Sequence, residues 1–281
     1  MTAAAARPDG FSIVQYAICL KGIVWREGLR FLHQRERFVA ALVRPLVWLF
    51  IFAAGFRQVL GVSIIPPYET YVLYEVYITP GLMALIQLFN GMSSSLSMVY
   101  DREMGNMRTL LVSPLPRWYL LSSKLVAGTA ISLLQVYAFL AVAWFWEIEP
   151  PPIGYLTVIP ALVLSGLMLG ALGMLISSVV KQLENFAGVM NFVIFPMFFA
   201  SSALYPLWRV REASPFLYYM CEFNPFTHAV ELIRFAFHGR LNALSLAVVC
   251  GCTAAFMLGA ILAYDPSRGF IARRGVGGGD A

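Results

Sequence analysis

Residues 156–180 read LTVIPALVLSGLMLGALGMLISSVV and contain no charged side chain. An apolar run of this length satisfies the roughly 20 residues that a helix needs to cross the hydrocarbon layer of a bilayer. The rest of the chain is similar, because 59% of its 281 residues are hydrophobic and only 12% are charged. A soluble domain carries about 25% charged residues. The composition therefore predicts an all-α integral membrane protein.

The other apolar runs predict six transmembrane helices in total. The candidate spans are residues 38–57, 73–99, 124–146, 156–180, 186–205 and 242–264. The second contains Pro80 and the fifth contains Pro196, so we expect each to bend or break there. The spans divide the chain into an N-terminal segment, a six-span domain and a tail. These three parts cover residues 1–37, 38–264 and 265–281.

The distribution of basic residues predicts the orientation of the chain in the membrane. If the N-terminus is cytoplasmic, the inner segments hold fourteen of the 20 Lys and Arg residues and the outer segments hold five. The positive-inside rule then places both termini in the cytoplasm. Arg44 lies within the first span and either extends to the inner interface or lines a polar path. Nucleic acid is not an expected partner, because the basic residues flank the spans instead of forming one stripe.

Several catalytic and metal-binding patterns are missing from the sequence. The chain has no G-x-x-x-x-G-K-[ST] loop, no H-E-x-x-H and no G-x-S-x-G. Its four cysteines lack the paired spacing of a metal site or a disulfide framework. We therefore expect no catalytic residues, no metal and no cofactor in this chain, and we do not expect it to be an enzyme.

Residues 13–37 predict an amphipathic helix that lies along the inner leaflet and contacts membrane lipids. Apolar residues from Ile13 to Leu32 share one side, and basic residues occupy much of the other. Two interpretations remain open. The helix is either a simple anchor or a lever that carries force from a cytoplasmic partner into the first span. The lever residues would be Arg26, Glu27 and Arg30.

The cytoplasmic loop 100–124 reads YDREMGNMRTLLVSPLPRWYLLSSK and combines three features. It has a cluster of acidic and basic residues, a short apolar patch at 110–112, and a turn set by two prolines. A loop that only joined two spans could be much shorter. The pattern favours a docking surface for a partner, and the alternative is a solvated loop with interface anchors.

The sequence resembles the ABC-2 type permeases, the membrane subunits of type V ABC exporters, and is closest to the NodJ-like and polysaccharide- or drug-export branch. The resemblance covers about residues 30–265. It is carried by Tyr77-Ile78-Thr79-Pro80-Gly81, Asp101-Arg102-Glu103 with Gly105, Leu111-Val112-Ser113-Pro114-Leu115-Pro116-Arg117, Phe199-Ala200-Ser201-Ser202-Ala203-Leu204-Tyr205-Pro206 and Asn224-Pro225-Phe226-Thr227. The family usually has Ser-Gly where this chain has Ser201-Ser202.

This resemblance implies a bacterial inner-membrane protein whose first cytoplasmic loop fits into a groove of a separate ATPase subunit. ATP and Mg would be bound by that partner. The N-terminal amphipathic helix would contact the ATPase and the first span. The docking end would comprise Asp101, Arg102, Glu103 and Gly105, while Pro114 and Arg117 would shape the return into the third span.

The outer segment 206–241 predicts short re-entrant helices before the last span, as the resemblance also implies. Phe226, Val230, Ile233 and Phe237 recur at helical spacing, with a Glu and an Arg on another face. The segment is either a packed outer cap or an exit gate. The candidate gate residues are Asn224, Pro225, Glu231 and Arg234.

Six spans need a second permease copy to enclose a path, so we expect a homodimer with two ATPases. A heterodimer with a paralogous permease is the alternative. The path would run along the first, second and fifth spans. Its candidate residues are Gln87, Asn90, Ser94, Asn191, Phe195 and Phe199. Their side chains would either contact the substrate or serve the packing and hydrogen bonding of neighbouring helices.

These patterns favour the permease subunit of an ATP-driven exporter of a glycan, a lipid-linked molecule or a drug-like compound. The first alternative is an ATP-independent channel or ion-coupled carrier, which usually has an ionisable residue deep in a span. The second is a membrane enzyme, which would need polar catalytic residues clustered at one interface.

Overall fold

A computed structural model describes residues 13–33, 35–56, 66–68, 72–103, 116–145, 151–180 and 182–263. Every element that these residues form is a helix, which confirms the all-α class. The helices are α1 (Ile13–His33), α2 (Arg35–Phe56), α3 (Tyr74–Glu103), α5 (Arg117–Trp144), α6 (Gly154–Val179), α7 (Leu183–Phe199), α8 (Leu207–Ala213), α9 (Pro215–Glu222), α10 (Pro225–Phe237) and α11 (Ala243–Ala263).

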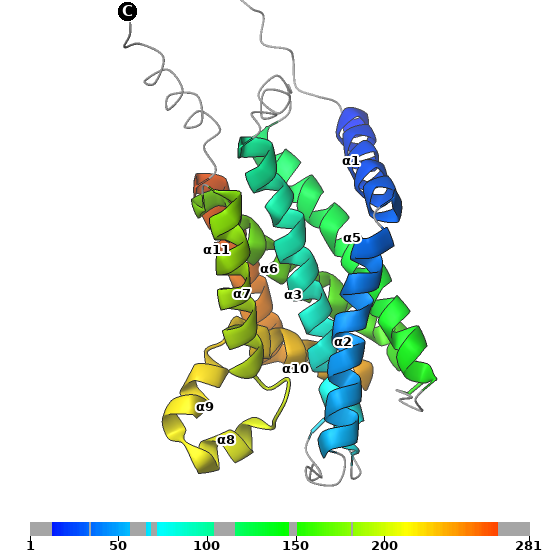
Figure 1. Cartoon of the computed structure of the whole chain (residues 1–281), viewed down its shortest axis with the longest axis vertical. Coiled ribbons are helices and arrows are strands. Elements are labelled where there is room, and N and C mark those ends of the chain that lie inside the picture. The colour runs from blue at the N-terminus through cyan, green and yellow to red at the C-terminus, as the bar shows by residue number, and fades with distance from the viewer. Residues whose placement is uncertain are drawn as a thin grey trace, which may run out of the picture.

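Helix α3 is the central element of the bundle. It contacts α2, α5, α6, α7 and α10, and Figure 1 shows these helices around it. Its side chains Ile78, Leu82 and Met83 are completely buried, as are Met168 and Leu162 of α6. The core therefore lies between α3 and α6, and the other long helices cover this pair.

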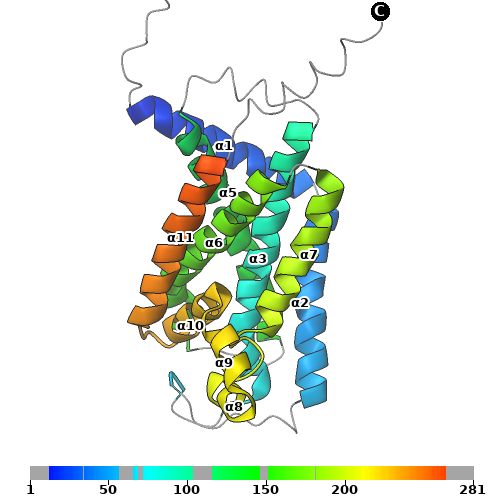
Figure 2. The ribbon, with the colours of Figure 1, turned by 90° about the vertical axis from the view of Figure 1, so that its left-hand side faces the viewer.

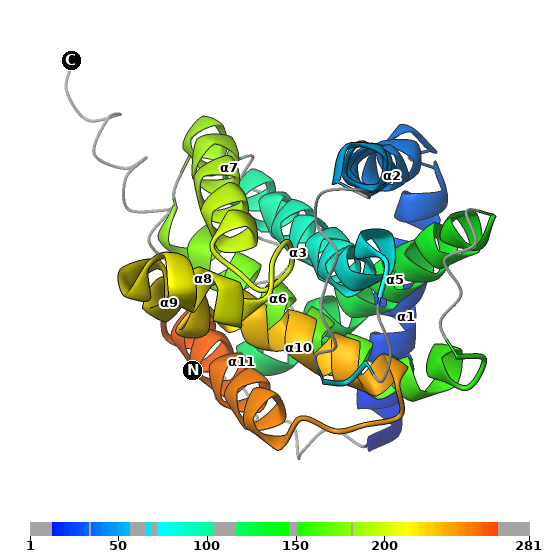
Figure 3. The same cartoon turned by 90° about the horizontal axis from the view of Figure 1, so that it is seen from below.

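The two ends of the bundle carry different elements (Figure 2). Helix α1 crosses one end, where α3 and α11 finish and α5 and α7 begin. Helices α8, α9 and α10 lie at the opposite end. Seen from that end in Figure 3, α10 crosses the bundle and contacts α3, α6 and α11. The short helices predicted within residues 206–241 are thus present, and they precede the last long helix.

Four of the six predicted spans are helices long and apolar enough to cross a membrane. They are Tyr74–Tyr100, Trp118–Trp144, Gly154–Val179 and Ala243–Ala263. The predicted first and fifth spans correspond to α2 and α7, whose described apolar stretches Leu42–Ile51 and Leu183–Phe199 are shorter. The chain is therefore a multi-helix membrane protein, and the count of six spans stays a prediction.

Pro80 does not interrupt its helix, whereas Pro196 lies close to the point where its helix ends. Helix α3 continues through Pro80, one and a half turns from its start, so the expected break is absent. Helix α7 ends at Phe199, just after Pro196, and the residues up to Tyr205 form no helix. The predicted fifth span 186–205 therefore ends too late, because this segment turns out of the helix.

Glycines allow the backbones of α3 and α6 to approach closely. A Cβ atom added to Gly91 would lie 2.9 Å from the Cα of Gly170. One added to Gly173 would lie 2.7 Å from the carbonyl oxygen of Gly91. Such distances leave no space for a methyl group, so α3 and α6 are in direct backbone contact. Small residues are the usual means of packing helices in a bilayer, where lipid supplies no hydrophobic force between them.

We predict that Gly91→Ala lowers the stability of the detergent-solubilised protein, because the added methyl group forces α3 away from α6. Overpacking of this kind costs about 1–3 kcal/mol. The matched control is Gly251→Ala in α11, where a Cβ atom would meet nothing within 4 Å. Thermal unfolding monitored by tryptophan fluorescence should show a lower transition temperature for Gly91→Ala only. Equal transitions for the two variants would contradict the close contact.

Candidate functional site

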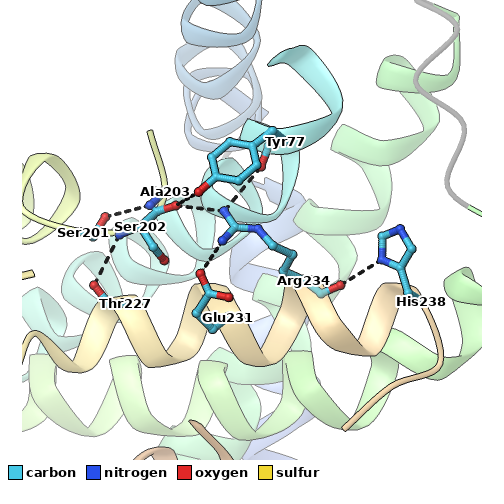
Figure 4. A network of polar contacts seen from close by, with 8 residues as sticks. All are labelled: Tyr77, Ser201, Ser202, Ala203, Thr227, Glu231, Arg234 and His238. Atoms are coloured by element: carbon cyan, nitrogen blue, oxygen red, sulfur yellow. Dashed lines mark hydrogen bonds and ion pairs between the residues drawn. The ribbon is translucent and has the colours of Figure 1, made fainter. Parts of the chain in front are cut away.

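The guanidinium of Arg234 connects three parts of the chain at the α8–α10 end (Figure 4). The side chain belongs to α10 and is only 3% exposed. Its Nη1 donates to the carboxylate of Glu231, and its Nη2 donates to the carbonyl oxygen of Ser202 at 2.8 Å. The guanidinium carbon lies 4.1 Å from the ring centre of Tyr77 in α3. One buried cation thereby holds α10, α3 and the turn after α7 together.

The same turn makes further hydrogen bonds with its surroundings. The hydroxyl of Tyr77 also donates to the carbonyl oxygen of Ser202, at 3.0 Å. The hydroxyl of Tyr74 donates to the carbonyl oxygen of Leu204 at 2.7 Å. The backbone N–H of Ser202 lies 3.4 Å from the hydroxyl of Thr227. We call Tyr77, Ser202, Thr227, Glu231 and Arg234 the Arg234 cluster.

The local sequence explains how α10 presents this cluster. Asn224 caps α10, because its Oδ1 accepts from the backbone N–H of Phe226 at 3.0 Å, and Pro225 occupies the first helical turn. The amide of Asn224 donates to the carbonyl oxygens of Met197 and Ala200, at 2.7 and 2.6 Å. The start of α10 is therefore tied to the end of α7.

Helical spacing then sets the two faces of α10. Glu231 and Arg234 stand three residues apart and share one face. Phe226, Val230 and Ile233 are completely buried. The four candidate gate residues all take part in the interactions at the start or on the polar face of α10, whereas their role as a gate stays a prediction.

Tyr68 packs beside the Arg234 cluster. The centre of its ring lies 4.9 Å from the ring centre of His238 and 6.3 Å from that of Tyr77. Burial raises the pKa of Tyr68 to about 12, with the nearby Arg234 guanidinium opposing part of the effect. The phenol is therefore neutral at physiological pH.

Three of the candidate path residues, Gln87, Asn90 and Ser94, lie on the side of α3 that faces α5 and α6. The amide of Gln87 donates to the carbonyl oxygen of Leu162 at 2.7 Å and accepts from the hydroxyl of Ser165 at 2.6 Å. The amide of Asn90 donates to the carbonyl oxygen of Gly128 at 2.8 Å. These partners belong to neighbouring helices of the same chain, and contact with a substrate stays a prediction.

Ser94 lies next to these residues in a small polar cleft between α3, α5 and α6. Its carbonyl oxygen accepts from the hydroxyl of Ser97, and the Nζ of Lys124 lies 3.5 Å from that hydroxyl. The cavity has a volume of about 10 Å³, which is the space of a single water molecule. Its size excludes a substrate molecule in this conformation.

The other three candidate path residues lie on α7 and face outward. Asn191 is exposed, and Phe195 and Phe199 are 40% and 41% exposed. The rings of Phe195 and Phe199 stack with their centres 6.4 Å apart. The ring centre of Phe199 lies 5.9 Å from that of Trp48 in α2. Helices α2 and α7 therefore present an aromatic surface that no other described part of the chain covers.

Arg44 lies on α2 close to this surface. Its guanidinium carbon is 3.9 Å from the ring centre of Phe89 in α3, while the residue remains exposed. The sequence left two positions open for this side chain, the inner interface or a polar path. The structure shows a cation–π contact with α3, which the spacing of the residues along the chain did not indicate.

The predicted lever helix α1 contacts the first turn of α5. The hydroxyl of Tyr119 donates to the carbonyl oxygen of Tyr16, and the two rings meet edge to face at 4.7 Å. Arg26 and Glu27 form an exposed ion pair at 3.1 Å. Arg30 lies in α1, but its side chain is outside the described residues. The contact with α5 was not predicted from the sequence.

The predicted coupling residues fall at helix ends or outside the described residues. Asp101, Arg102 and Glu103 form the last residues of α3, and Arg117 is the first residue of α5. The structure describes the backbone of these four and not their side chains. Gly105 and Pro114 lie in residues 104–115, outside the described part of the chain. The two helix ends lie at the same end of the bundle as α1 (Figure 2).

No three His, Cys, Asp or Glu side chains come together as a metal site within the part of the chain that the structure describes. The candidate site that the described residues form is a set of helix contacts. It comprises the Arg234 cluster at one end, the α1–α5 contact at the other, and the exposed aromatic surface between them.

A bundle of long apolar helices with an amphipathic helix across one end and short helices at the other is typical of a multi-helix membrane protein. Residues 19–238 match the model of the ABC-2 type transporter family, and the chain belongs to this family. It is 27% identical to the transport permease ycf38 of Cyanophora paradoxa over 71% of this chain and 67% of that protein.

Two further relatives agree with this assignment. The transport permease ycf38 of Porphyra purpurea is 25% identical over 78% of this chain and 73% of its own length. The multidrug ABC transporter permease YbhR of Escherichia coli K12 is 30% identical over 57% of this chain and 43% of its own length. The predicted resemblance to ABC-2 permeases is confirmed.

We predict that Glu231→Gln and Arg234→Gln each lower the melting temperature and that the double variant loses less than the sum of the two. Each single change leaves one polar partner without its counter-charge, which costs about 3–5 kcal/mol when the pair is fully buried. Arg234→Gln also removes the hydrogen bond to Ser202 and the contact with the Tyr77 ring, so its loss should be at least as large as that of Glu231→Gln. The double-mutant cycle measures the coupling. Additive losses would show that the two side chains act independently.

Proposed function

We propose that this chain is the membrane-spanning permease subunit of an ATP-driven exporter that works with a separate ATPase subunit. The chain is an ABC transporter permease by family, and its sequence contains no phosphate-binding loop. The observation that carries the proposal is the position of α1, the end of α3 and the start of α5 at one end of the bundle (Figure 2). A partner docked there would reach all three helices at once.

The contacts of α5 support a route for the motion. The ATPase would bind ATP and Mg and would push on the docking residues between α3 and α5. Helix α5 meets α1 through Tyr119 and Tyr16, and it also packs on α3 and α6. A displacement of the docking loop would therefore move α1 and the core helices together. This geometry favours the lever interpretation of α1 over a simple anchor.

We place a second copy of the chain against α2 and α7. Their exposed aromatic residues and the exposed Val47, Phe50 and Ile51 of α2 form an apolar surface on this side of the molecule. Two copies meeting there would enclose a path between them, lined by Asn191, Phe195 and Phe199. A homodimer is the simplest such assembly, and a paralogous permease would use the same surface.

The orientation and the substrate follow from the same proposal. The α1 end would face the cytoplasm of a bacterial inner membrane, with both chain termini there and the α8–α10 end outside. Among glycans, lipid-linked molecules and drug-like compounds, the relative named as a multidrug permease favours a drug-like compound.

An ATP-independent channel or ion-coupled carrier is the second candidate. Carriers of this kind use ionisable residues near the middle of the bilayer. In the four long helices described here, the ionisable residues lie toward the ends, as Glu75 and Lys124 illustrate. This placement favours the ATPase-dependent subunit.

The proposal predicts that Glu103→Arg abolishes co-purification of the ATPase encoded with this permease while membrane insertion is unchanged. The charge reversal would place a cation at the docking end of α3. The matched control is Glu212→Arg, the same change on the exposed helix α8 at the opposite end. Quantitative affinity purification from mild detergent measures both variants. Normal recovery of the ATPase with Glu103→Arg would reject the docking assignment, and a wild-type chain recovered without any ATPase would favour the carrier.

A second prediction tests the lever. Tyr119→Phe removes the hydroxyl that reaches Tyr16 and keeps the ring, so substrate-stimulated ATPase activity of the reconstituted complex should fall several-fold, since one such bond contributes about 1 kcal/mol. Tyr137→Phe is the control, because its hydroxyl makes a similar bond between α5 and α6 at the opposite end. An equal effect of the two variants would point to general destabilisation of α5.

A further inference from the structure

A pocket opens next to the Arg234 cluster and is distinct from the path proposed along α2 and α7. Its volume is about 340 Å³, and its walls come from α3, α8, α9, α10 and the start of α11. Small-molecule sites in proteins have volumes of roughly 300–1,000 Å³. The pocket is thus large enough for a small organic molecule and lies within one chain.

The walls of the pocket are mainly aromatic and aliphatic. Tyr77, Trp208 and Phe235 contribute rings, and Leu207 and Leu244 contribute aliphatic side chains. These groups come from four different helices or their ends. They provide apolar surface on which a flat or bulky hydrophobic body can rest.

The charged groups of the lining are two carboxylates and one guanidinium. Glu231 and Arg234 form the ion pair of the Arg234 cluster, and the ring of Tyr77 covers the guanidinium. The remaining carboxylate belongs to Glu222 of α9, whose carbonyl oxygen lies 3.0 Å from Nε2 of His228. The carboxylates of the lining therefore outnumber its guanidinium by two to one.

Two arginines lie near the pocket, and Tyr218 is close to both Arg211 and Glu222. Arg209 lies 5.3 Å from the ring centre of Trp208, and Arg211 lies 5.6 Å from that of Tyr218. Neither arginine is among the lining residues. A ligand inside the pocket would thus meet carboxylate and aromatic groups, while the one lining cation is already paired and covered.

We propose that this pocket binds an amphiphilic organic cation. Its charge would lie near Glu222 and Glu231, and its apolar body would rest on Trp208 and Phe235. Aromatic faces attract cations, and this attraction adds to that of the carboxylates. The same chemistry describes a free lipophilic cation and the ammonium headgroup of a phospholipid.

Binding in this pocket would be linked to the Arg234 cluster because Glu231 belongs to both. A cation close to the Glu231 carboxylate competes with Arg234 for the same negative charge. By reciprocity, a change that weakens the hold of Arg234 on Glu231 strengthens cation binding.

The test uses two ions of the same shape and opposite charge, tetraphenylphosphonium and tetraphenylborate. The purified full-length chain in lipid-free detergent is titrated with each ion by calorimetry, without nucleotide or ATPase. We expect saturable binding of the phosphonium and at least tenfold weaker binding of the borate. Failure of the ATPase to co-purify would overturn the exporter proposal and would leave this result unaffected.

Glu222→Gln should weaken phosphonium binding about tenfold, because it removes one carboxylate and keeps the size of the side chain. Trp208→Leu should weaken it as well. Glu212→Gln is the control, since Glu212 lies on the same helix as Trp208 and does not line the pocket. Thermal melting of each variant separates a lost site from a lost fold. Equal binding of the two ions, or a phosphonium affinity that Glu222→Gln and Trp208→Leu leave unchanged, overturns the proposal.

A competition experiment distinguishes a phospholipid headgroup from a free cation as the occupant of the pocket. Short-chain phosphatidylethanolamine is added to the phosphonium complex of the wild-type chain. Displacement that requires Glu222 supports a lipid headgroup as the occupant, and absence of displacement supports a free cation.

Discussion

The direct backbone contact between α3 and α6 is the constraint on which the rest of the bundle depends. Gly91, Gly170 and Gly173 bring the two helices together with no side chain between them. This closeness puts the Gln87 amide within reach of α6, where it bonds to Leu162 and Ser165. Helices α2 and α7 lie outside this central pair and carry exposed apolar side chains, as α11 also does.

The turn after α7 illustrates the cost of irregular backbone in a membrane protein. A helix satisfies its own carbonyl groups, whereas residues 200–205 are not helical, and lipid offers no donors in exchange. Side chains are the donors instead. Asn224 donates to the carbonyl oxygen of Ala200, and Tyr74 donates to that of Leu204. Arg234 and Tyr77 both donate to the carbonyl oxygen of Ser202. The motifs Tyr77–Gly81 and Asn224–Thr227, which looked like separate pieces in the sequence, both contribute to the support of this one turn.

Local patterns in the sequence were enough to predict the long apolar helices and the Glu231–Arg234 pair, because both depend on residues a few positions apart. The end of α7 was predicted too late, since apolar composition continues past Phe199 while the backbone does not stay helical. The contacts of Arg234 with Ser202 and Tyr77 could not be predicted, because these residues lie 32 and 157 positions away in the sequence. The Tyr16–Tyr119 contact was missed for the same reason, with 103 residues between its partners.

The sharing of one acceptor by two donors has a mechanical consequence. Both Arg234 and Tyr77 donate to the carbonyl oxygen of Ser202, so a displacement of that single atom breaks both bonds together. Each helix also keeps a second bond to the turn, from Tyr74 of α3 to Leu204 and from Asn224 at the start of α10 to Ala200. The contacts of α3 and α10 with the turn are therefore coupled at this one atom, and a movement of Ser202 changes both at once.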